Sequence, residues 1–286
     1  MKASELAWFN GALMERERAN PSIASNTLHL GTAVFDGMMA YWNDDHWHLH
    51  FGREHLQRFL SGAGHMDLVL SWSADELLAG VRALVDTLPA DTHYIRPIAY
   101  RTGPEVFFQV DEESTSACIF AVPVGRDVDA GYRCQLSAVR RVPHEAIPAT
   151  WKVSGAYANS YLAERNARAD GFDTGIMLDI HGRIAEASSS NLFFVRGDTL
   201  VTPRLTGDIF PGITRSMLID LAAGAGIPVT QRDIWPRELT EFDAAFLCGT
   251  LSEVRPISQI SDFHYRSESH SLVRFIIESF RTRTHQ

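Results

Sequence analysis

Lysine is scarce in this chain of 286 residues, where it occurs only as Lys2 and Lys152. An arginine side chain stays charged, whereas a desolvated lysine amine can lose its proton and attack a carbonyl carbon to form a Schiff base. A general preference for arginine would explain the scarcity by itself, and Lys152 would then be one more surface charge. The residues that follow Lys152 favour a chemical role instead.

Four polar residues downstream of Lys152 lie where they could take part in such chemistry. Tyr157 falls in the first turn of an expected helix, and Glu186 falls on the second strand of an expected hairpin. Thr214 follows a Pro-Gly turn at the start of another helix, where its hydroxyl, free backbone N–H groups and the helix dipole suit a phosphate. Thr250 lies in a tight turn after a buried strand, which is a second possible anion site.

A lysine, a carboxylate, a phenol and a phosphate-binding turn are the groups needed to hold pyridoxal 5'-phosphate (PLP). The lysine binds the aldehyde, the carboxylate keeps the pyridine nitrogen protonated so that the ring accepts electrons, and the phenol bonds the ring oxygen. Each signal alone is weak, because a glutamate on a strand is usually solvated and Gly-Ile-Thr at a helix start is usually a cap. Taken together, they point to PLP.

The elements that must position these groups fall into two parts. In residues 1–124 we expect a hairpin at Asn10-Gly11, a hairpin at Asp44-Asp45, a helix over 53–66, a helix to about 88 opened by the Ser73/Glu76 capping box, and strands at 92–101 and 116–124. Residues 125–132 are polar and flanked by glycine, so we expect them to form an interdomain linker.

Residues 133–286 are expected to form the second, larger domain. We expect a strand at 134–142, a helix over 157–169 that ends at Gly171, hairpins turning at 181–182 and 197–198, a helix over 213–225, strands at 227–231 and 244–248, and a helix over 269–281. This mixture indicates an α+β fold. It lacks the regular βαβ alternation and the GxGxxG turn of a dinucleotide-binding fold.

Composition and charge argue against several classes of partner. A net charge of −9 and a pI near 5.7 argue against nucleic acid and against an anionic membrane surface. No apolar stretch approaches the roughly 20 residues needed to span a bilayer, and the N-terminal residues are not typical of a signal peptide. We therefore expect a cytoplasmic protein without membrane or nucleic-acid partners.

Cysteine and histidine give no metal-binding pattern. Cys118, Cys134 and Cys248 have apolar neighbours, so we expect buried thiols in a reducing compartment. The histidines at 46, 48 and 50 alternate as on an exposed strand face, and a metal site there is the weaker alternative. We predict no metal ion.

The chain as a whole resembles a known family, the class IV, fold-type IV PLP-dependent aminotransferases, and within it the branched-chain amino acid aminotransferase group. The resemblance runs from WFNG through HLGTAVFDG, REHLQRF and YIRP, and then from Lys152 through PGITR to GTLSE. Its most specific part is the E-x-S-x-SNLF segment that begins at Glu186. It implies a smaller N-terminal α/β domain and a larger C-terminal domain with a hairpin-rich sheet or barrel and helices.

The resemblance also implies roles for single residues around the cofactor. Lys152 would be the catalytic Schiff-base lysine and proton carrier, Tyr157 would bond the ring oxygen, and Glu186 would bond the pyridine nitrogen. The remaining cofactor-binding residues would be the ring-packing Phe210 and a phosphate-binding set made of Arg58, Ile213, Thr214 and Thr250. By itself, Arg58 could be an ordinary helix-surface arginine, but its place in the REHLQR segment favours contact with the phosphate.

A second set of residues would bind the substrate, and it comprises Phe35, Tyr94, Arg96, Thr250 and Leu251. By composition alone, Tyr94 and Phe210 would be core aromatics. Arg96 has the strand neighbours of a buried residue, and a buried arginine needs an anion. That anion could be a substrate carboxylate or a structural acid such as Glu105.

Departures from the family pattern bear on the substrate. The family's HYG reads His29-Leu30-Gly31 here, Met38-Met39 stand where branched-chain enzymes often carry an arginine, and GNY reads Gly155-Ala156-Tyr157. The first two changes predict a more apolar pocket that is poorly equipped for a second carboxylate. They put 2-oxoglutarate as acceptor and branched-chain amino acids as donor in doubt.

The resemblance implies ping-pong transamination between an apolar or branched-chain-like L-amino acid and a 2-oxo acid. Three alternatives stay open: a same-fold PLP lyase of the aminodeoxychorismate-lyase type, a D-amino acid transaminase, and a binding protein without activity. The family also implies a homodimer or a higher homo-oligomer.

Overall fold

The computed structural model describes residues 3–104, 106–108, 114–125 and 131–284. The chain divides into two compact units: unit 1 is Met1–Arg126, Trp151–Ala156 and Thr284–Gln286, and unit 2 is Asp127–Thr150 and Tyr157–Arg283. Most of the expected linker, residues 126–130, lies outside the described residues, as does Glu105. No helix in the described ranges is long and apolar enough to cross a membrane.

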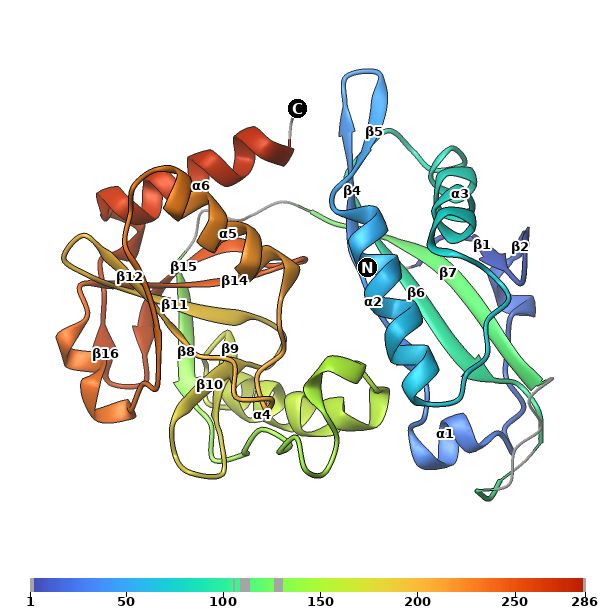
Figure 1. Cartoon of the computed structure of the whole chain (residues 1–286), viewed down its shortest axis with the longest axis horizontal. Helices are drawn as coiled ribbons and strands as arrows, with labels where there is room; N and C mark the ends of the chain where they lie inside the picture. Colours follow the sequence, from blue (N-terminus) through green and yellow to red (C-terminus); the bar gives the residue numbers. More distant parts are fainter. Residues whose placement is uncertain (1–2, 105, 109–113, 126–130, 285–286) are drawn as a thin grey trace. The chain divides into compact units, whose positions relative to one another are not determined.

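Unit 1 is built on an antiparallel sheet, which among the described residues has seven strands in the order β2-β1-β7-β6-β4-β5, with β3 paired to β6 (Figure 1). The strands are β1 (Leu6–Phe9), β2 (Ala12–Glu15), β3 (Val34–Phe35), β4 (Met38–Asn43), β5 (His46–Leu49), β6 (His93–Arg101) and β7 (Thr115–Pro123). The two expected hairpins are confirmed. Asn10 and Gly11 both have positive φ, as the tight β1–β2 turn requires.

Helices α2 (Gly52–His65) and α3 (Ala74–Val85) pack on one face of this sheet. The Ser73/Glu76 capping box is formed on both sides, so the predicted start of α3 is confirmed. Alternation along β6 sends Ile95 and Ala99 into the core, while Tyr94 and Arg96 are only partly buried on the other face. The face away from the helices therefore presents polar and aromatic side chains.

Unit 2 is a larger mixed sheet, with nine strands among the described residues in the order β10-β9-β8-β15-β14-β11-β12-β13 and with β16 paired to β15. Three pairs, β8–β9, β8–β15 and β12–β13, are parallel. The strands are β8 (Tyr132–Leu136), β9 (Thr174–Leu178), β10 (Ile184–Ala187), β11 (Asn191–Arg196), β12 (Thr199–Pro203), β13 (Val229–Arg232), β14 (Ala244–Gly249), β15 (Glu253–Ile260) and β16 (Phe263–His264).

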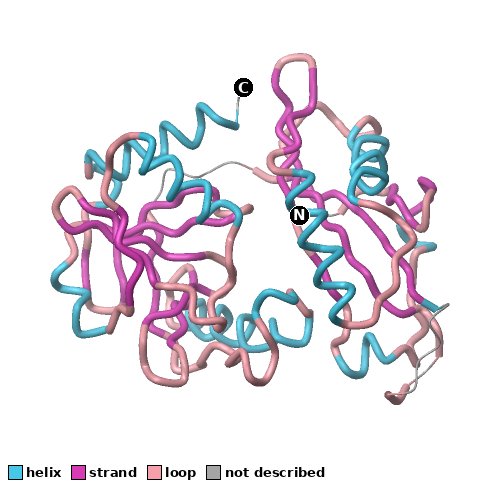
Figure 2. The backbone as a smooth tube through the Cα atoms, viewed as in Figure 1, coloured by secondary structure: helices cyan, strands magenta, loops and turns pink. Residues whose placement is uncertain are grey.

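Three helices accompany the unit 2 sheet: α4 (Tyr157–Ala169), α5 (Ile213–Gly224) and α6 (Ser271–Thr284) (Figure 2). The predicted hairpins β9–β10 and β11–β12 and the predicted α4 and α5 are confirmed, and Gly171 after α4 has the left-handed φ of 82° expected at a helix end. All three cysteines are free and buried, as expected.

The structure corrects one sequence prediction in unit 2 and adds a strand that was not predicted. The strand expected over residues 134–142 ends at Leu136, because the chain then turns into a loop in which the backbone N–H groups of Ser137 and Arg141 still bond carbonyls of β9. The long strand β15 was not predicted, and it contains Pro256, a residue that is uncommon in central strands. The proline is accommodated because the pairing with β8 begins at Ile257, one residue later.

In unit 1 the short helix α1 (Asn26–Leu30) was also not predicted. Ser25 caps it through the N–H of Thr27, and Gly31 ends it with a φ of 67°. Its single turn and a half carries too few residues for a helical pattern to show in the sequence.

Candidate active site

The segment that carries Lys152 is fixed in unit 1 by strand-like hydrogen bonds. The Phe35 N–H donates to the Lys152 carbonyl at 3.4 Å, and the Ser154 N–H donates to the Ala33 carbonyl at 2.8 Å. Lys152 itself has a φ of 52°, a left-handed conformation that is uncommon for a lysine. Residues 151–156 thus belong to unit 1, although α4 that follows them belongs to unit 2.

Three glycines permit this close packing of the Lys152 segment. A Cβ on Gly31 would lie 2.9 Å from the Gly155 Cα, and a Cβ on Gly62 would lie 2.5 Å from the Trp151 carbonyl oxygen. The indole of Trp151 stacks on the His65 ring, with 5.0 Å between the ring centroids. The glycines of the HLG and GAY segments are therefore needed where two backbones meet.

Lys152 lies among the residues expected to bind substrate. Its Nζ is 5.1 Å from the centroid of the Phe35 ring, and the Arg96 guanidinium lies 4.4 Å from the same centroid and 5.0 Å from the Tyr94 centroid. The Tyr94 phenol also passes so close to Gly37 that a Cβ there would overlap it. Arg96 is partly exposed and stacked between aromatic rings, so the prediction of a buried arginine is wrong.

Arg58 is held by a buried carboxylate of the same unit. Its Nε and Nη2 donate to the two oxygens of Asp36, both at 2.8 Å, and the His55 Nδ1 also lies 2.8 Å from Asp36 Oδ1. The Asp36 side chain is fully buried and that of Arg58 is 16% exposed. Asp36 thus occupies one edge of the guanidinium and fixes the direction in which its remaining N–H groups point.

Burial and charge shift the pKa values of this group in a consistent way. Burial raises the pKa of Asp36, but hydrogen bonds from Arg58 and His55 and the charge of Arg58 outweigh it and hold that pKa well below its usual range. Burial lowers the pKa of His55 despite its bond to Asp36. The cluster therefore contains a carboxylate, a guanidinium and a neutral imidazole that donates from Nδ1.

The two methionines that depart from the family pattern point in opposite directions. Met38 pairs with Ile95 on the face that packs against the helices, whereas Met39 pairs with Tyr94 on the other face. Both are buried, and Leu30 is exposed. Of these methionines, only Met39 shares a sheet face with the expected substrate residues, which narrows the predicted apolar contribution to the pocket.

In unit 2, Glu186 is bonded from several sides. The Arg141 Nε lies 2.8 Å from Oε1, the Asn191 Nδ2 donates to Oε2 at 3.0 Å, and the Phe210 N–H lies 3.2 Å from both oxygens. The Glu186 side chain is 6% exposed. These contacts connect β10, β11 and the turn before α5, and they fix the plane of the carboxylate.

The N-terminus of α5 has the properties of an anion site. Its N-cap is Gly212, which has no side chain to bond the first N–H groups, and Thr214 in the first turn is buried. A Cβ on Gly212 would overlap the Asn191 Oδ1. Asn191 also donates to the Phe210 carbonyl at 2.9 Å, so a hydrogen bond joins the SNLF segment to the residue that precedes the PGIT segment.

The turn that carries Thr250 and Leu251 joins β14 to β15. Gly249 pairs with Glu253 at its base, and Glu253 has a φ of 50°. The Ser190 hydroxyl donates to the Ser252 hydroxyl at 2.9 Å, which ties this turn to the segment before β11. The turn at Thr250, the start of α5 and Glu186 are thus all connected through β11 and the residues that flank it.

Tyr157 opens α4, whose position on the sheet is set by a small polar network. Glu164 Oε2 accepts hydrogen bonds from the hydroxyls of Thr174 and Ser188, both at 2.6 Å. A Cβ on Gly175 would lie 2.8 Å from the Ala163 carbonyl oxygen, so α4 packs closely on β9.

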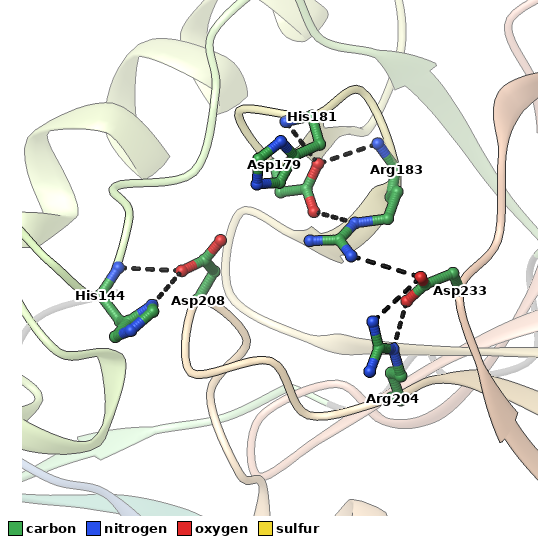
Figure 3. A network of polar contacts seen from close by, with 7 residues as sticks. All are labelled: His144, Asp179, His181, Arg183, Arg204, Asp208 and Asp233. Atoms are coloured by element: carbon green, nitrogen blue, oxygen red, sulfur yellow. Dashed lines mark hydrogen bonds and ion pairs between the residues drawn. The ribbon is translucent and has the colours of Figure 1, made fainter.

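Outside these groups, unit 2 holds a polar network on its loops (Figure 3). Asp179 accepts from the N–H groups of His181 and Arg183 at 2.9 Å, and Arg183 and Arg204 both pair with Asp233. This network fixes the β9–β10 turn.

Beside it, Asp208 accepts the His144 N–H at 2.8 Å and lies 3.1 Å from the His144 Nδ1 (Figure 3). His144, Glu145 and Asp208 have ligand atoms within 4.8 Å of one another. The contacts between His144 and Asp208 fix the loop before Lys152 to the segment before α5.

The residues present fit PLP. Unit 1 supplies an amine at Lys152 and a cation at Arg58 whose other edge is taken by Asp36. Unit 2 supplies a fixed, buried carboxylate at Glu186 and a helix N-terminus whose glycine cap leaves its amides without a side-chain acceptor. These are an aldehyde-binding group, a partner for a protonated ring nitrogen, and donors for a phosphate.

The amino-acid sequence and the fold match those of known enzymes. The model of the family "Amino-transferase class IV" matches residues 33–260, more than half of the chain. This chain belongs to the class IV aminotransferases. The predicted family and the predicted PLP-dependent transaminase activity are thereby confirmed.

Individual relatives of this aminotransferase are similar over most of their length. A probable branched-chain-amino-acid aminotransferase of Aquifex aeolicus is 35% identical over 265 residues, covering 90% of this chain and 85% of the relative. The crystal structure of the Thermoproteus uzoniensis branched-chain aminotransferase with norvaline superposes with a TM-score of 0.94 at 33% identity, covering 99% and 95%.

Two further solved structures contain the cofactor or a derivative of it. The Thermobaculum terrenum branched-chain amino acid aminotransferase in its PLP form has a TM-score of 0.92 at 27% identity, covering all of this chain and 95% of its own. Another branched-chain amino acid aminotransferase, complexed with N-(5'-phosphopyridoxyl)-L-glutamate, has a TM-score of 0.91 at 29% identity, with the same coverage. The fold-type IV prediction is confirmed, and the aminotransferase uses PLP.

Sequence reasoning missed several residues that complete the aminotransferase's polar groups. Asp36 and Asn191 were read only as letters of the FDG and SNLF segments, and His55 and Arg141 were given no role. Arg141 had a usable signal, because it lies beside Val142 in the strand predicted over residues 134–142, and an arginine that is buried there needs an acid. Asp36 and His55 had none, since their partners become visible only in the fold.

Proposed function

We propose that this aminotransferase moves an amino group from an apolar, branched-chain-like L-amino acid to a 2-oxo acid by a ping-pong mechanism. The observation that carries the proposal is the set formed by Lys152, Phe35, Tyr94 and Arg96 in unit 1. Aromatic rings suit an apolar side chain, and the guanidinium suits a carboxylate. The names of the relatives, branched-chain aminotransferases, support the same substrate class.

When bound, PLP supplies an aldehyde that reacts with amines and a ring that withdraws electrons from the substrate Cα. In our proposal Lys152 holds that aldehyde in the resting enzyme. Once the substrate amine has displaced it, the Lys152 Nζ would remove the Cα proton and deliver it to the former aldehyde carbon, two bonds from Cα, as a general base and then a general acid. Its left-handed backbone conformation and its bonds to β3 fix where that amine starts.

The remaining cofactor residues bind and orient PLP in this proposal. Glu186 accepts a hydrogen bond from the ring nitrogen, Tyr157 donates to the ring oxygen, and Phe210 packs against the ring. The phosphate is bound by Arg58, Ile213, Thr214 and Thr250, of which Thr214 contributes a buried hydroxyl at the α5 N-terminus.

We propose that two features bind the substrate carboxylate: the guanidinium of Arg96 and the backbone N–H groups of the Thr250-Leu251 turn. Arg96 is stacked on Phe35 and Tyr94. This stacking orients its planar guanidinium before substrate binds, so that less side-chain entropy is lost on binding. The positive φ of Glu253 holds the turn in a tight form that suits an anion.

We propose that the enzyme works in the cytoplasm as a homodimer or a higher homo-oligomer. The exposed large apolar side chains among the described residues of unit 1 include Ile23, Leu28, Phe107 and Phe108. Their two segments are joined by the Ser22 N–H, which donates to the Thr102 carbonyl at 3.1 Å. Such a group of side chains is typical of an interface between copies. Three free, buried thiols fit a reducing compartment.

The first test is the Lys152→Ala variant. It should lose the near-visible absorbance band of enzyme-bound PLP and lose turnover, and a variant that kept both would refute the role of Lys152. A screen of amino donors against the wild type then tests the substrate class. Faster reaction with L-leucine than with L-glutamate supports the proposal, and faster reaction with D-amino acids, or release of an eliminated product without amino transfer, supports one of the alternatives.

A further inference from the structure

Arg141 is a buried arginine with no role in the proposed mechanism, and it contacts Glu186 directly. Its side chain is 5% exposed and its Nε lies 2.8 Å from Glu186 Oε1. Arg141 follows β8, in the loop that leads to Lys152, so its partner lies 45 positions further along the chain. A guanidinium in such a place needs an anion, and Glu186 provides it.

The other contacts of Arg141 connect Glu186 to the turn before α5. The same Nε donates to the Asp208 carbonyl at 3.2 Å, and Nη1 lies 3.5 Å from the Ser160 hydroxyl of α4. Asp208 precedes Phe210, whose N–H bonds both oxygens of Glu186. The bonds of Arg141 to Asp208 and Ser160 are thus made to neutral groups, and its charged contact is the one with Glu186.

The bond from Arg141 to Glu186 carries a positive charge to the carboxylate. Asn191 donates through an amide and Phe210 through its backbone N–H, and neither changes the charge balance of the carboxylate. Burial lowers the pKa of Arg215, and the charge of Glu186 raises it to a smaller extent, so Arg215 also interacts with Glu186 electrostatically. Its Nη2, however, is hydrogen-bonded elsewhere, to the Pro203 carbonyl at 3.0 Å and to Gln231 at 2.9 Å. A neighbouring guanidinium favours the ionised form of a buried carboxyl group, and that is the form which can accept a bond from a protonated ring nitrogen.

We propose that Arg141 is a positioning residue for cofactor binding, which acts by keeping Glu186 ionised and aimed. The inference rests on the proposed role of Glu186 at the pyridine nitrogen. Arg141 itself is assigned no contact with substrate or cofactor. Its effect on PLP passes through Glu186, and that is what separates it from a residue that merely supports the fold.

The test is a double-mutant cycle on the full-length enzyme, stripped of PLP and titrated with it while the near-visible absorbance is recorded. Arg141→Gln should raise the Kd for PLP roughly 10-fold, within the range of couplings between directly paired residues. It should also shift the absorbance maximum of the bound cofactor toward that of Glu186→Gln. Arg141→Lys, which keeps the charge but lacks the planar fork, should recover part of the affinity.

Arg140 provides a matched control, because it is the preceding residue, has the same charge, and is exposed. Arg140→Gln should leave the Kd for PLP within about 2-fold of wild type, as expected for a surface change. In the Glu186→Gln background, Arg141→Gln should then change the Kd by less than about 2-fold, since the residue through which it acts is gone.

The outcomes distinguish a failure at Glu186 from a failure at Arg141. If Glu186→Gln binds PLP like the wild type, the proposed role of Glu186 fails. If Glu186→Gln weakens binding but Arg141→Gln matches Arg140→Gln, the inference fails while the proposed function stands. An equal loss from Arg141→Gln in both backgrounds shows a purely structural role and also overturns it. If Arg141→Gln does not fold, the same cycle is run with Arg141→Lys, whose smaller loss must also vanish beside Glu186→Gln.

Discussion

Asp36 offers a direct measure of how strongly Arg58 is held, because its buried carboxylate accepts four hydrogen bonds. Two come from Arg58 and one from His55, each at 2.8 Å, and the fourth comes from the Gly37 N–H at 2.7 Å. Asp36→Asn removes the charge and turns an NH₂ group toward donors. Breaking a buried ion pair from one side costs about 3–5 kcal/mol. Since the Arg58 side chain is 16% exposed and can regain some water, we expect the lower end, about 3 kcal/mol.

The pH dependence of this loss follows from the lowered pKa of Asp36. A carboxyl group whose folded-state pKa is depressed stabilises the protein above its unfolded-state pKa of about 3.9, and that contribution is lost as the pH falls toward the folded-state value. The difference in the free energy of unfolding between wild type and Asp36→Asn should therefore be constant from about pH 8 to about pH 5. It should narrow by about 0.7 kcal/mol at about pH 3.5.

Urea unfolding of the PLP-free enzyme measures both the loss of stability caused by Asp36→Asn and its dependence on pH. A second ion pair that involves α2 supplies a matched control. Arg53, on the same helix as Arg58, pairs with Asp75 on the surface, where both side chains are more than half exposed. Asp75→Asn should cost less than about 1 kcal/mol. If Asp36→Asn costs no more than Asp75→Asn near neutral pH, or if its gap to wild type stays constant into the acid range, the buried pair does not stabilise the fold in this way.

Two further predictions concern the phosphate-binding turn and His55. Gly212→Ala would place a Cβ onto the Asn191 Oδ1, so PLP titration should show at least about 10-fold weaker binding, and unchanged binding would mean that the turn shifts freely. Because the pKa of His55 is lowered by burial, the unfolded chain takes up its proton first, and wild-type stability should fall as the pH drops below about 6.5. His55→Gln should make the free energy of unfolding in urea depend less on pH between about pH 7 and about pH 5. A pH dependence as steep as that of the wild type would contradict a neutral buried imidazole.

Sequence patterns predicted the elements whose signals are local. The Asn10-Gly11 turn and the Ser73/Glu76 capping box each consist of a few adjacent residues whose backbone preferences fix one geometry, and both are present in the structure. The start of α5 was predicted in the same way, from a Pro-Gly turn followed by apolar residues at helical spacing. Family resemblance added PLP and transaminase chemistry, which no single motif could have established.

Apart from the short helix α1, the features that escaped prediction depend on how the strands pair. Strand β15 contains Pro256, and the strand is stable because β14 and β8, the latter more than a hundred residues earlier, pair on either side of it. The same holds for Arg96, which was expected to be buried from its neighbours in the sequence. Its real environment is set by Phe35 on the adjacent strand β3 and by Tyr94 two positions before it.

Lys152 shows how the two kinds of information combine. Its chemistry could be read from the residue type and the motif, but its geometry depends on a close approach between Gly31 and Gly155 that no local pattern encodes. A Cβ on Gly31 would lie 2.9 Å from the Gly155 Cα, and a Cβ on Gly155 would lie 3.1 Å from the Gly31 carbonyl oxygen, so a side chain at either position would force these two backbones to shift. The amine would still be present in the sequence, but the segment that positions it against the Phe35 ring would move. Glycines of this kind are therefore as necessary to the site as the lysine, although they carry no reactive group.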